Sequence, residues 1–273
     1  MTETRKIGLA LGGGAARGLA HIGVLDVLQK ESIPIDMIAG TSAGAVIGAL
    51  YAQGRDSGVL RDLVRGLTRK RLISLADLIP SRTGLIQGEK IKDLLEVAIG
   101  GDMAFTDLKI PFACIATDIM TGEEVVINQG SVLDGVRASI SIPLLFSATK
   151  WRSRYLVDGG LVNPVPVSVL RKMGADFVIA VNVIPEIHHN AHEAGEETKK
   201  DIKEPNIFSV IVQSMQMAQC LLVRSSIQDA DIVINPDAAH IGFGDFYRAR
   251  ECIKQGEIAA RDSISEIKRR LET

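Results

Sequence analysis

The sequence contains little cysteine: Cys114, Cys220 and Cys252 are the three among 273 residues. They lie far apart, match no zinc-site spacing, and are odd in number, so they cannot all pair within one chain. We therefore interpret them as buried free thiols in a reducing compartment. This excludes a small secreted scaffold that depends on disulfides for its stability.

A charge excess of either sign is also absent, because 31 basic residues face 33 acidic ones and the formal net charge is −2. Such a balance creates no field for nucleic acid and no strong attraction to anionic membranes. The apolar run at 7–11 dissolves into glycines and does not resemble a signal peptide. The charge-free stretch 37–54 contains four glycines and suits a buried turn and helix better than lipid. We expect a cytoplasmic protein.

Internal repeats and clean linkers are missing too. A length of 273 residues with 46% hydrophobic content suits one globular domain with a sizeable core. Residues 6–183 carry all the motifs described below, and residues 184–273 carry none.

Short apolar runs of strand length alternate with helical patterns. The run at 6–11 precedes an amphipathic pattern at 19–28, and the run at 33–39 precedes a helix-forming stretch at 45–50. Strands that are each followed by a helix indicate an α/β fold with a mainly parallel sheet. Further strands are expected at 111–117, 123–128, 151–157, 177–183 and 231–235, and further helices at 56–98 with a break at 80–84, 131–138, 207–222 and 248–271.

A glycine-rich loop, GGGAARG at 12–18, follows the first expected strand. Arg17 stands where a dinucleotide-binding fingerprint needs glycine, and the Lys-Ser/Thr ending of a P-loop is absent. These departures count against nucleotide binding, which stays as a minor alternative. Consecutive glycines at a helix start still expose several backbone N–H groups. Such a nest binds an anion, whether a phosphate or a transient oxyanion.

A second motif, Gly40-Thr41-Ser42-Ala43-Gly44, lies between the second expected strand and its helix. A serine on a sharp turn of this kind is accessible to a substrate. Gly40 and Gly44 remove side chains that would clash there, and the helix N-terminus favours negative charge. The alternative is a small-residue turn that only opens a buried helix.

Asp158 ends the expected strand at 151–157 and is followed by two glycines. A carboxylate in this position can point into a cleft, or it can make only a local turn hydrogen bond. Ester hydrolysis through an acyl-enzyme needs a nucleophile, a base and an oxyanion stabiliser. Ser42, Asp158 and the amides of the glycine-rich loop are candidates for these roles.

A triad histidine is not evident. We interpret His21 as a structural partner of the glycine-rich loop and keep His240 as a weak candidate base. Three further histidines lie in the polar stretch 185–205, which is either a lid or an ordinary loop. Their acidic setting favours adventitious metal binding over a metal site. The three are His188, His189 and His192.

Taken together, the motifs resemble those of bacterial members of the patatin-like phospholipase family. Four of them occur in the family's order: the loop at 12–18, the motif at 40–44, the stretch ASISIP at 138–143, and Asp158-Gly159-Gly160. The resemblance implies a three-layer α/β/α sandwich around a mainly parallel sheet. It also implies a dyad in which Ser42 is the nucleophile and Asp158 the base. The implied oxyanion hole and its supporting residues are Gly12, Gly13, Gly14 and Ala15, with Arg17 and Gly18.

The same resemblance implies hydrolysis of lipid acyl esters through an acyl-Ser42 intermediate, without a metal or other cofactor. A lysophospholipase, phospholipase A or carboxylesterase would fit. The expected partners are a lipid or lysophospholipid and, transiently, a membrane or micelle surface. Self-association stays open. Residues 184–273 would shape the acyl pocket, with Met215 and Met217 as core residues or as an acyl-facing wall. The alternatives are an acyltransferase that uses the same acyl-enzyme, and a non-catalytic regulatory or adaptor protein.

Overall fold

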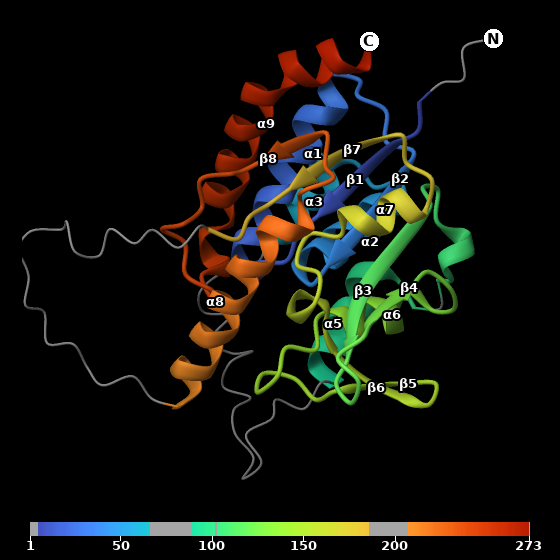
Figure 1. The fold of residues 1–273 in the computed structure, drawn as a ribbon, viewed down its shortest axis with the longest axis vertical. Coiled ribbons are helices and arrows are strands. Elements are labelled where there is room, and N and C mark those ends of the chain that lie inside the picture. The colour runs from blue at the N-terminus through green and yellow to red at the C-terminus, as the bar shows by residue number, and fades with distance from the viewer. Residues whose placement is uncertain (1–4, 66–88, 102, 186–206, 273) are drawn as a thin grey trace, which may run out of the picture.

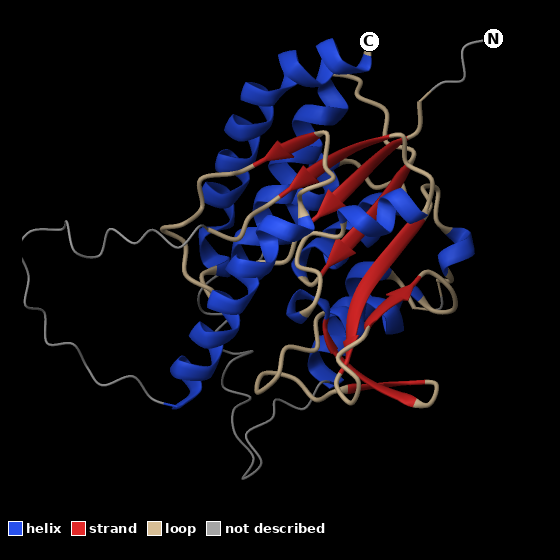
Figure 2. Ribbon diagram, viewed as in Figure 1, coloured by secondary structure: helices blue, strands red, loops and turns tan. Residues whose placement is uncertain are grey.

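One mixed β-sheet runs through the centre of the chain in the computed structural model, which describes residues 5–65, 89–101, 103–185 and 207–272 (Figures 1 and 2). Strand order along the sheet is β5-β6-β3-β2-β1-β7-β8, and β4 pairs with β3. The strands are β1 (Ile7–Leu11), β2 (Met37–Thr41), β3 (Phe112–Asp118), β4 (Glu124–Ile127), β5 (Thr149–Trp151), β6 (Arg154–Asp158), β7 (Phe177–Val181) and β8 (Ile232–Ile234).

Five neighbouring strands, β3, β2, β1, β7 and β8, are parallel, so their carboxyl ends lie at one edge of the sheet. Both faces of β1, β2 and β7 are buried, which explains their continuous apolar sequences. β4 and β6 are antiparallel to β3. β2 pairs with the first half of β3, and β6 pairs with the last residues of β3. Both strands lie on the edge of β3 that is opposite to β4. The last residues of β2 and β6, Thr41 and Asp158, therefore approach each other.

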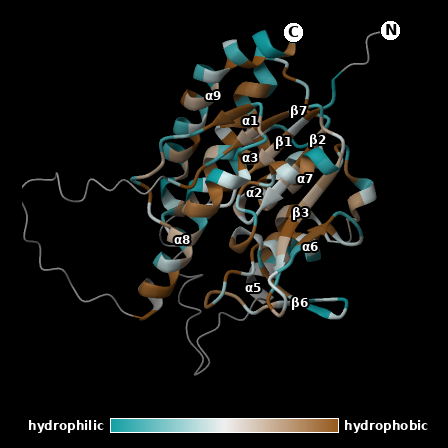
Figure 3. Ribbon diagram, in the orientation of Figure 1, coloured by the Kyte–Doolittle hydropathy of each residue, from teal (hydrophilic) through white to brown (hydrophobic). Residues whose placement is uncertain are grey.

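Helices cover both faces of the sheet and complete the expected three-layer sandwich (Figure 2). One face packs against α1 (Ala20–Lys30), α2 (Ala43–Ala52), α3 (Ser57–Arg65), α5 (Glu89–Ile99), α6 (Val132–Ser139) and α9 (Ala249–Leu271). The other packs against α7 (Val167–Lys172) and α8 (Ile207–Ser226). Apolar colour is concentrated in the central strands (Figure 3). The α8 helix extends outward on the side of the carboxyl ends of the parallel strands (Figure 1).

The last helix, α9, lies along α1 (Figure 1). A Cβ on Gly23 of α1 would collide with the carbonyl oxygen of Ile253, and a Cβ on Gly256 of α9 would collide with that of Ala20. Only glycine at these two positions allows such a close backbone approach. Segments far apart in the sequence are thereby held together.

The structure differs from the sequence-based expectation in three elements. The run at 151–157 is not one strand but the β5–β6 hairpin, whose turn places Arg152 at a φ of 55°. β2 begins at Met37 and not at residue 33, because the N–H of Ile33 donates to the carbonyl oxygen of Leu28 at the end of α1 and Pro34 has no N–H to donate. The helix α7 was not expected. The expected helical stretch 56–98 contains α3 and α5, and its break at 80–84 lies outside the described residues.

Candidate active site

Ser42 lies between β2 and α2, as the sequence predicts. Its φ of 53° and ψ of −119° form a conformation that residues other than glycine rarely adopt. The N–H of Ser42 donates to the hydroxyl of Ser139 at 2.9 Å. Ser139 is completely buried at the end of α6, so the last residue of α6 holds the turn in place.

Two glycines bring α2 directly onto the sheet. A Cβ on Gly44 would collide with the carbonyl oxygen of Leu11 in β1, and a Cβ on Gly40 would lie 2.5 Å from the carbonyl oxygen of Gly44. Backbone contacts of this kind leave no room for repacking. They fix the first turn of α2, and with it Ser42, relative to the carboxyl ends of β1 and β2.

Asp158 lies directly beside Ser42, 116 residues away in the sequence. The hydroxyl of Ser42 donates to Oδ2 of Asp158 at 2.6 Å, and the N–H of Gly160 donates to Oδ1 at 2.8 Å. Asp158 is only 1% exposed. Burial raises its pKa to about 6, although the hydrogen bonds from Ser42 and Gly160 act in the opposite direction. The carboxyl group is thus a stronger base than an exposed aspartate.

Of the four loop residues expected to form an oxyanion hole, two have N–H groups that are paired within the fold. The N–H groups of Gly12 and Gly13 donate instead to the carbonyl oxygens of Val181 and Pro164, at 3.0 and 2.9 Å. These two amides are therefore unavailable, contrary to the expectation from the sequence. Gly14 and Ala15 have φ values of 151° and 50°. In the described part of the chain, their N–H groups have no acceptor, and both residues line the cavity at Ser42.

Contacts from distant segments hold this loop. Nε of Arg17 donates to the carbonyl oxygen of Ile241 at 2.8 Å, and the N–H of Ala16 donates to that of Phe243 at 3.2 Å. Gly18 packs closely on Ala43, where a Cβ would collide. Arg17 is buried, which lowers its pKa from the usual range.

His21 supports the loop from α1. Its Nε2 lies 2.8 Å from the carbonyl oxygen of Gly12 and donates to it. Burial lowers the pKa of His21 to about 4, so the imidazole is neutral at pH 7. The interpretation of His21 as a structural partner is confirmed.

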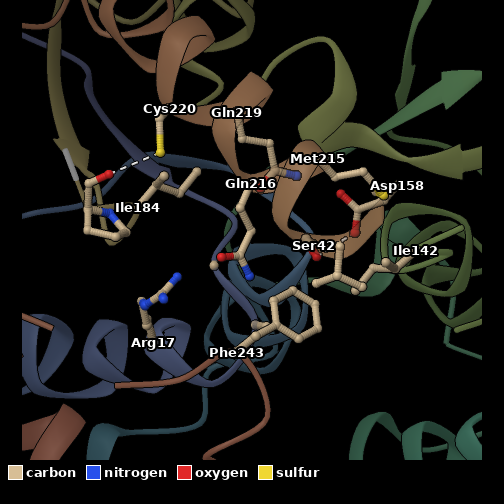
Figure 4. Close-up of a pocket in the computed structure, with 14 residues that line it drawn as sticks. Arg17, Ser42, Ile142, Asp158, Ile184, Met215, Gln216, Gln219, Cys220 and Phe243 are labelled. Atoms are coloured by element: carbon tan, nitrogen blue, oxygen red, sulfur yellow. Dashed lines mark hydrogen bonds between the residues drawn. The ribbon is translucent and has the colours of Figure 1, made fainter. Parts of the chain in front are cut away.

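Two cavities meet at Ser42. The first, here called the dyad cavity, has a volume of about 40 Å³ and contains both Ser42 and Asp158 (Figure 4). Arg17 lies on its wall opposite Asp158, and Gln216 and Gln219 reach into it from α8 (Figure 4). The remaining lining residues are Gly14, Ala15, Ile142, Ile184, Pro185, Val212, Met215, Cys220 and Phe243.

The second cavity, here called the apolar cavity, has a volume of about 230 Å³ and is walled almost entirely by carbon. It lies against the first turns of α2 and shares Ala15, Ser42, Ile142 and Phe243 with the dyad cavity. The residues unique to it are Gly18, Leu19, Ala43, Val46, Ile47, Ile140, Leu145, Phe146 and Phe246.

Several side chains occupy places that differ from their sequence-based interpretation. Met215 lines the dyad cavity, whereas Met217 is exposed and is not a core residue. Cys220 is half-buried in the same cavity, although Cys114 and Cys252 are buried as expected. These positions follow from the orientation of α8, which has one face on the cavity and the other on solvent.

His240 is not near the dyad. It is exposed, its Nε2 lies 2.7 Å from Oε1 of Glu251, and it lines neither cavity. It is therefore unsuited to act as the base. The three histidines at 188, 189 and 192 lie outside the described residues.

Sequence reasoning missed the side chains that shape the cavities. Gln216 and Gln219 are polar residues three positions apart, on one face of a helix that is more apolar than polar, which is a readable signal. Phe243 and Phe246 have no such signal, because only tertiary packing brings their loop to Ser42.

The fold and the site together define an α/β protein with a strand–serine–helix turn, as in α/β hydrolases. The family model for patatin-like phospholipase matches residues 9–171. The chain belongs to the patatin-like phospholipase family, which confirms the resemblance seen in the sequence.

Relatives of this chain include much longer proteins. A Mycobacterium tuberculosis protein described as an uncharacterized NTE family protein is 36% identical over 206 residues, covering 76% of this chain and 54% of that protein. Neuropathy target esterase sws of Drosophila melanogaster is 35% identical over 184 residues, covering 65% of this chain and 13% of that protein. The chain thus spans about half the length of the first relative and much less of the second.

Among solved structures, VipD from Legionella pneumophila has a similar fold. The TM-score is 0.55 at 12% identity, and the match covers 96% of this chain and 67% of that one. At this identity the similarity concerns the fold alone.

Proposed function

We propose that the protein hydrolyses lipid acyl esters, with Ser42 as the nucleophile and Asp158 as the base. The observation that carries this proposal is the 2.6 Å hydrogen bond from Ser42 Oγ to Asp158 Oδ2, at the junction of two cavities. Membership of the patatin-like phospholipase family and the esterase among the relatives support it.

Asp158 moves the proton in each half-reaction. As Oγ of Ser42 bonds to the acyl carbon, its proton passes to Oδ2 of Asp158 and the carbonyl π electrons move to oxygen. When the ester C–O bond breaks, this proton passes to the leaving alcohol. Water then gives a proton to Asp158 and its hydroxide to the acyl carbon. The fatty acid leaves, and the proton returns to Ser42.

The N–H groups of Gly14 and Ala15 are the proposed donors to the oxyanion. They have no other acceptor among the described residues and line the cavity at Ser42. Amides held in place before the reaction stabilise the developing charge without reorganisation. Arg17 and His21 position this loop through Ile241 and Gly12 respectively.

The two cavities orient the substrate. The apolar cavity of about 230 Å³ suits one acyl chain, because clefts that enclose drug-sized ligands measure about 300–1,000 Å³. The dyad cavity offers Arg17, Gln216 and Gln219 to a polar leaving group. Single-chain esters such as lysophospholipids are therefore the preferred substrate class.

A fluorophosphonate probe tests the proposal directly. We expect stoichiometric labelling, mapped by mass spectrometry to Ser42, and its loss in the Asp158→Asn variant. The chain offers a matched control pair: Ser57 is also buried and donates to the carboxylate of Asp26, at 2.9 Å, but lines neither cavity. Labelling of Ser57, or none at all on the folded protein, would contradict the proposal.

A further inference from the structure

The helix α8 has an unusual composition for a surface helix. Over 20 residues it contains one charged side chain, Arg224, and no acidic one. The apolar face of a helix is normally buried against the rest of the protein. Here, four large apolar residues of α8 are exposed: Ile207 at 74%, Val210 at 41%, Met217 at 51% and Leu221 at 73%.

These four residues share one side of the helix. Their spacings of three, seven and four positions return to the same face at 3.6 residues per turn. We call this set, Ile207, Val210, Met217 and Leu221, the outer stripe. Brown segments along α8, including the end where the helix begins, show the apolar content of this helix in Figure 3.

The opposite side of α8 forms a wall of the dyad cavity, through Val212, Met215, Gln216 and Gln219. One helix therefore faces the proposed reaction centre on its inner side and presents apolar side chains to water on its outer side. Amphipathic helices bind lipid surfaces by burying an apolar face at the level of the headgroups.

We infer that the outer stripe of α8 docks the protein onto a lipid surface. The inference deepens the proposed function and rests on it, because a lipid ester must be taken from such a surface. Three observations select a lipid surface as the occupant. The stripe belongs to the helix that also lines the dyad cavity, the helix has no acidic residue to repel phosphate groups, and its one charge is positive.

The position of α8 in the fold agrees with this orientation. The helix extends outward at the carboxyl edge of the parallel strands, where Ser42 also lies (Figure 1). The turn after β3 is at the same edge, and it exposes Ile119 and Met120. No helix in the described ranges is long and apolar enough to cross a bilayer. Docking on the surface is therefore the mode of contact that α8 supports.

The test compares two double variants of matched design. Met217→Glu with Leu221→Glu places two charges on the outer stripe, and glutamate has a helix propensity close to that of the residues it replaces. The control, Val59→Glu with Leu63→Glu, makes the same i,i+4 change at exposed positions of α3, on the other face of the sheet. Neither pair lines either cavity.

Binding is measured by flotation with vesicles of ether-linked phosphatidylcholine and phosphatidylglycerol, which cannot be hydrolysed at an acyl ester. Hydrolysis of monomeric p-nitrophenyl butyrate is measured in parallel. We expect the α8 variant to bind vesicles at least about ten-fold more weakly than the wild type, since two apolar side chains lose their burial in lipid. The α3 variant should bind normally, and all three proteins should hydrolyse the soluble ester equally.

Unchanged vesicle binding by the α8 variant, or an equal loss in the α3 variant, would overturn the inference. The inference would also be overturned if light scattering showed a dimer for the wild type and a monomer for the α8 variant while both bound vesicles equally well. The stripe would then bind a second copy of the chain. If none of the proteins hydrolysed the soluble ester, the proposed function would fail. The flotation result would still decide the role of the stripe.

Discussion

Replacing Asp158 by asparagine should remove activity and at the same time stabilise the fold. Asparagine keeps the size of the side chain and an oxygen that accepts the Gly160 N–H, now 2.8 Å from Oδ1. It cannot take a proton from Ser42. Loss of a general base slows catalysis by about 10²–10⁴-fold, so ester hydrolysis should fall by at least about that factor.

The stabilisation follows from the pKa of the carboxyl group. Burial raises the pKa of Asp158 from 3.8 to about 6, so the folded state holds this proton more tightly than the unfolded state. The stability associated with that proton is fully present below about pH 4 and is lost as the pH rises through about 6. Above pH 6 the buried carboxylate costs roughly 3 kcal/mol. Asparagine stays neutral and avoids this cost.

Urea unfolding of both proteins at pH 4 and pH 7.5 measures the effect. The free energy of unfolding of the variant, relative to that of the wild type, should be up to about 3 kcal/mol higher at pH 7.5 than at pH 4, which corresponds to roughly 5 °C in melting temperature. Asp26→Asn is the opposite control. Burial would raise the pKa of Asp26, but hydrogen bonds from Lys30 and Ser57 and the charge of Arg61 outweigh it and lower the pKa. That variant should lose stability at pH 7.5. A change in Asp158→Asn that is independent of pH would refute the reasoning.

Three further substitutions test the supports of the site. Ser139→Ala leaves the N–H of Ser42 without its acceptor and should lower kcat with little change in KM, which steady-state kinetics on a soluble ester will show; an unchanged kcat would exclude a positioning role. Gly44→Ala forces a methyl group into the backbone of β1 and should destabilise the fold by several kcal/mol in calorimetry. His21→Asn should weaken the support of Gly12. It should also remove the loss of stability that the wild type suffers as the pH falls from 6.5 to about 4, because in that range the imidazole is protonated in the unfolded state but not in the folded state. An acid unfolding profile like that of the wild type would contradict this.

The turn at Ser42 and the position of Asp158 could be predicted because both depend on local patterns. Glycines next to a serine after an apolar run indicate a sharp turn, whatever surrounds it. Their pairing was implied by the family resemblance alone, because no local pattern shows that the order of the strands brings the two residues together. The start of β2 was misplaced, because the apolar run alone does not show that the N–H of Ile33 pairs with the carbonyl oxygen of Leu28 at the end of α1.

The oxyanion loop shows where prediction from sequence ends. Four small residues in succession indicate exposed amides, but not the direction of each N–H. Pairing with Val181 and contact with Pro164 use up the amides of Gly12 and Gly13, and these acceptors lie more than 150 residues away in the chain. The aromatic walls at Phe243 and Phe246 depend in the same way on packing that no local pattern records.

The contacts that hold the glycine-rich loop relate the site to the order in which the chain is made. Ser42 and Asp158 are both present in the nascent chain once translation has passed residue 158. The carbonyl groups of Ile241 and Phe243 that anchor the loop, and the α9 helix that lies along α1, are translated later than both residues. Since chains fold from the N-terminus as they emerge, we expect a nascent chain to be inert towards the lipids around it until α9 has been released.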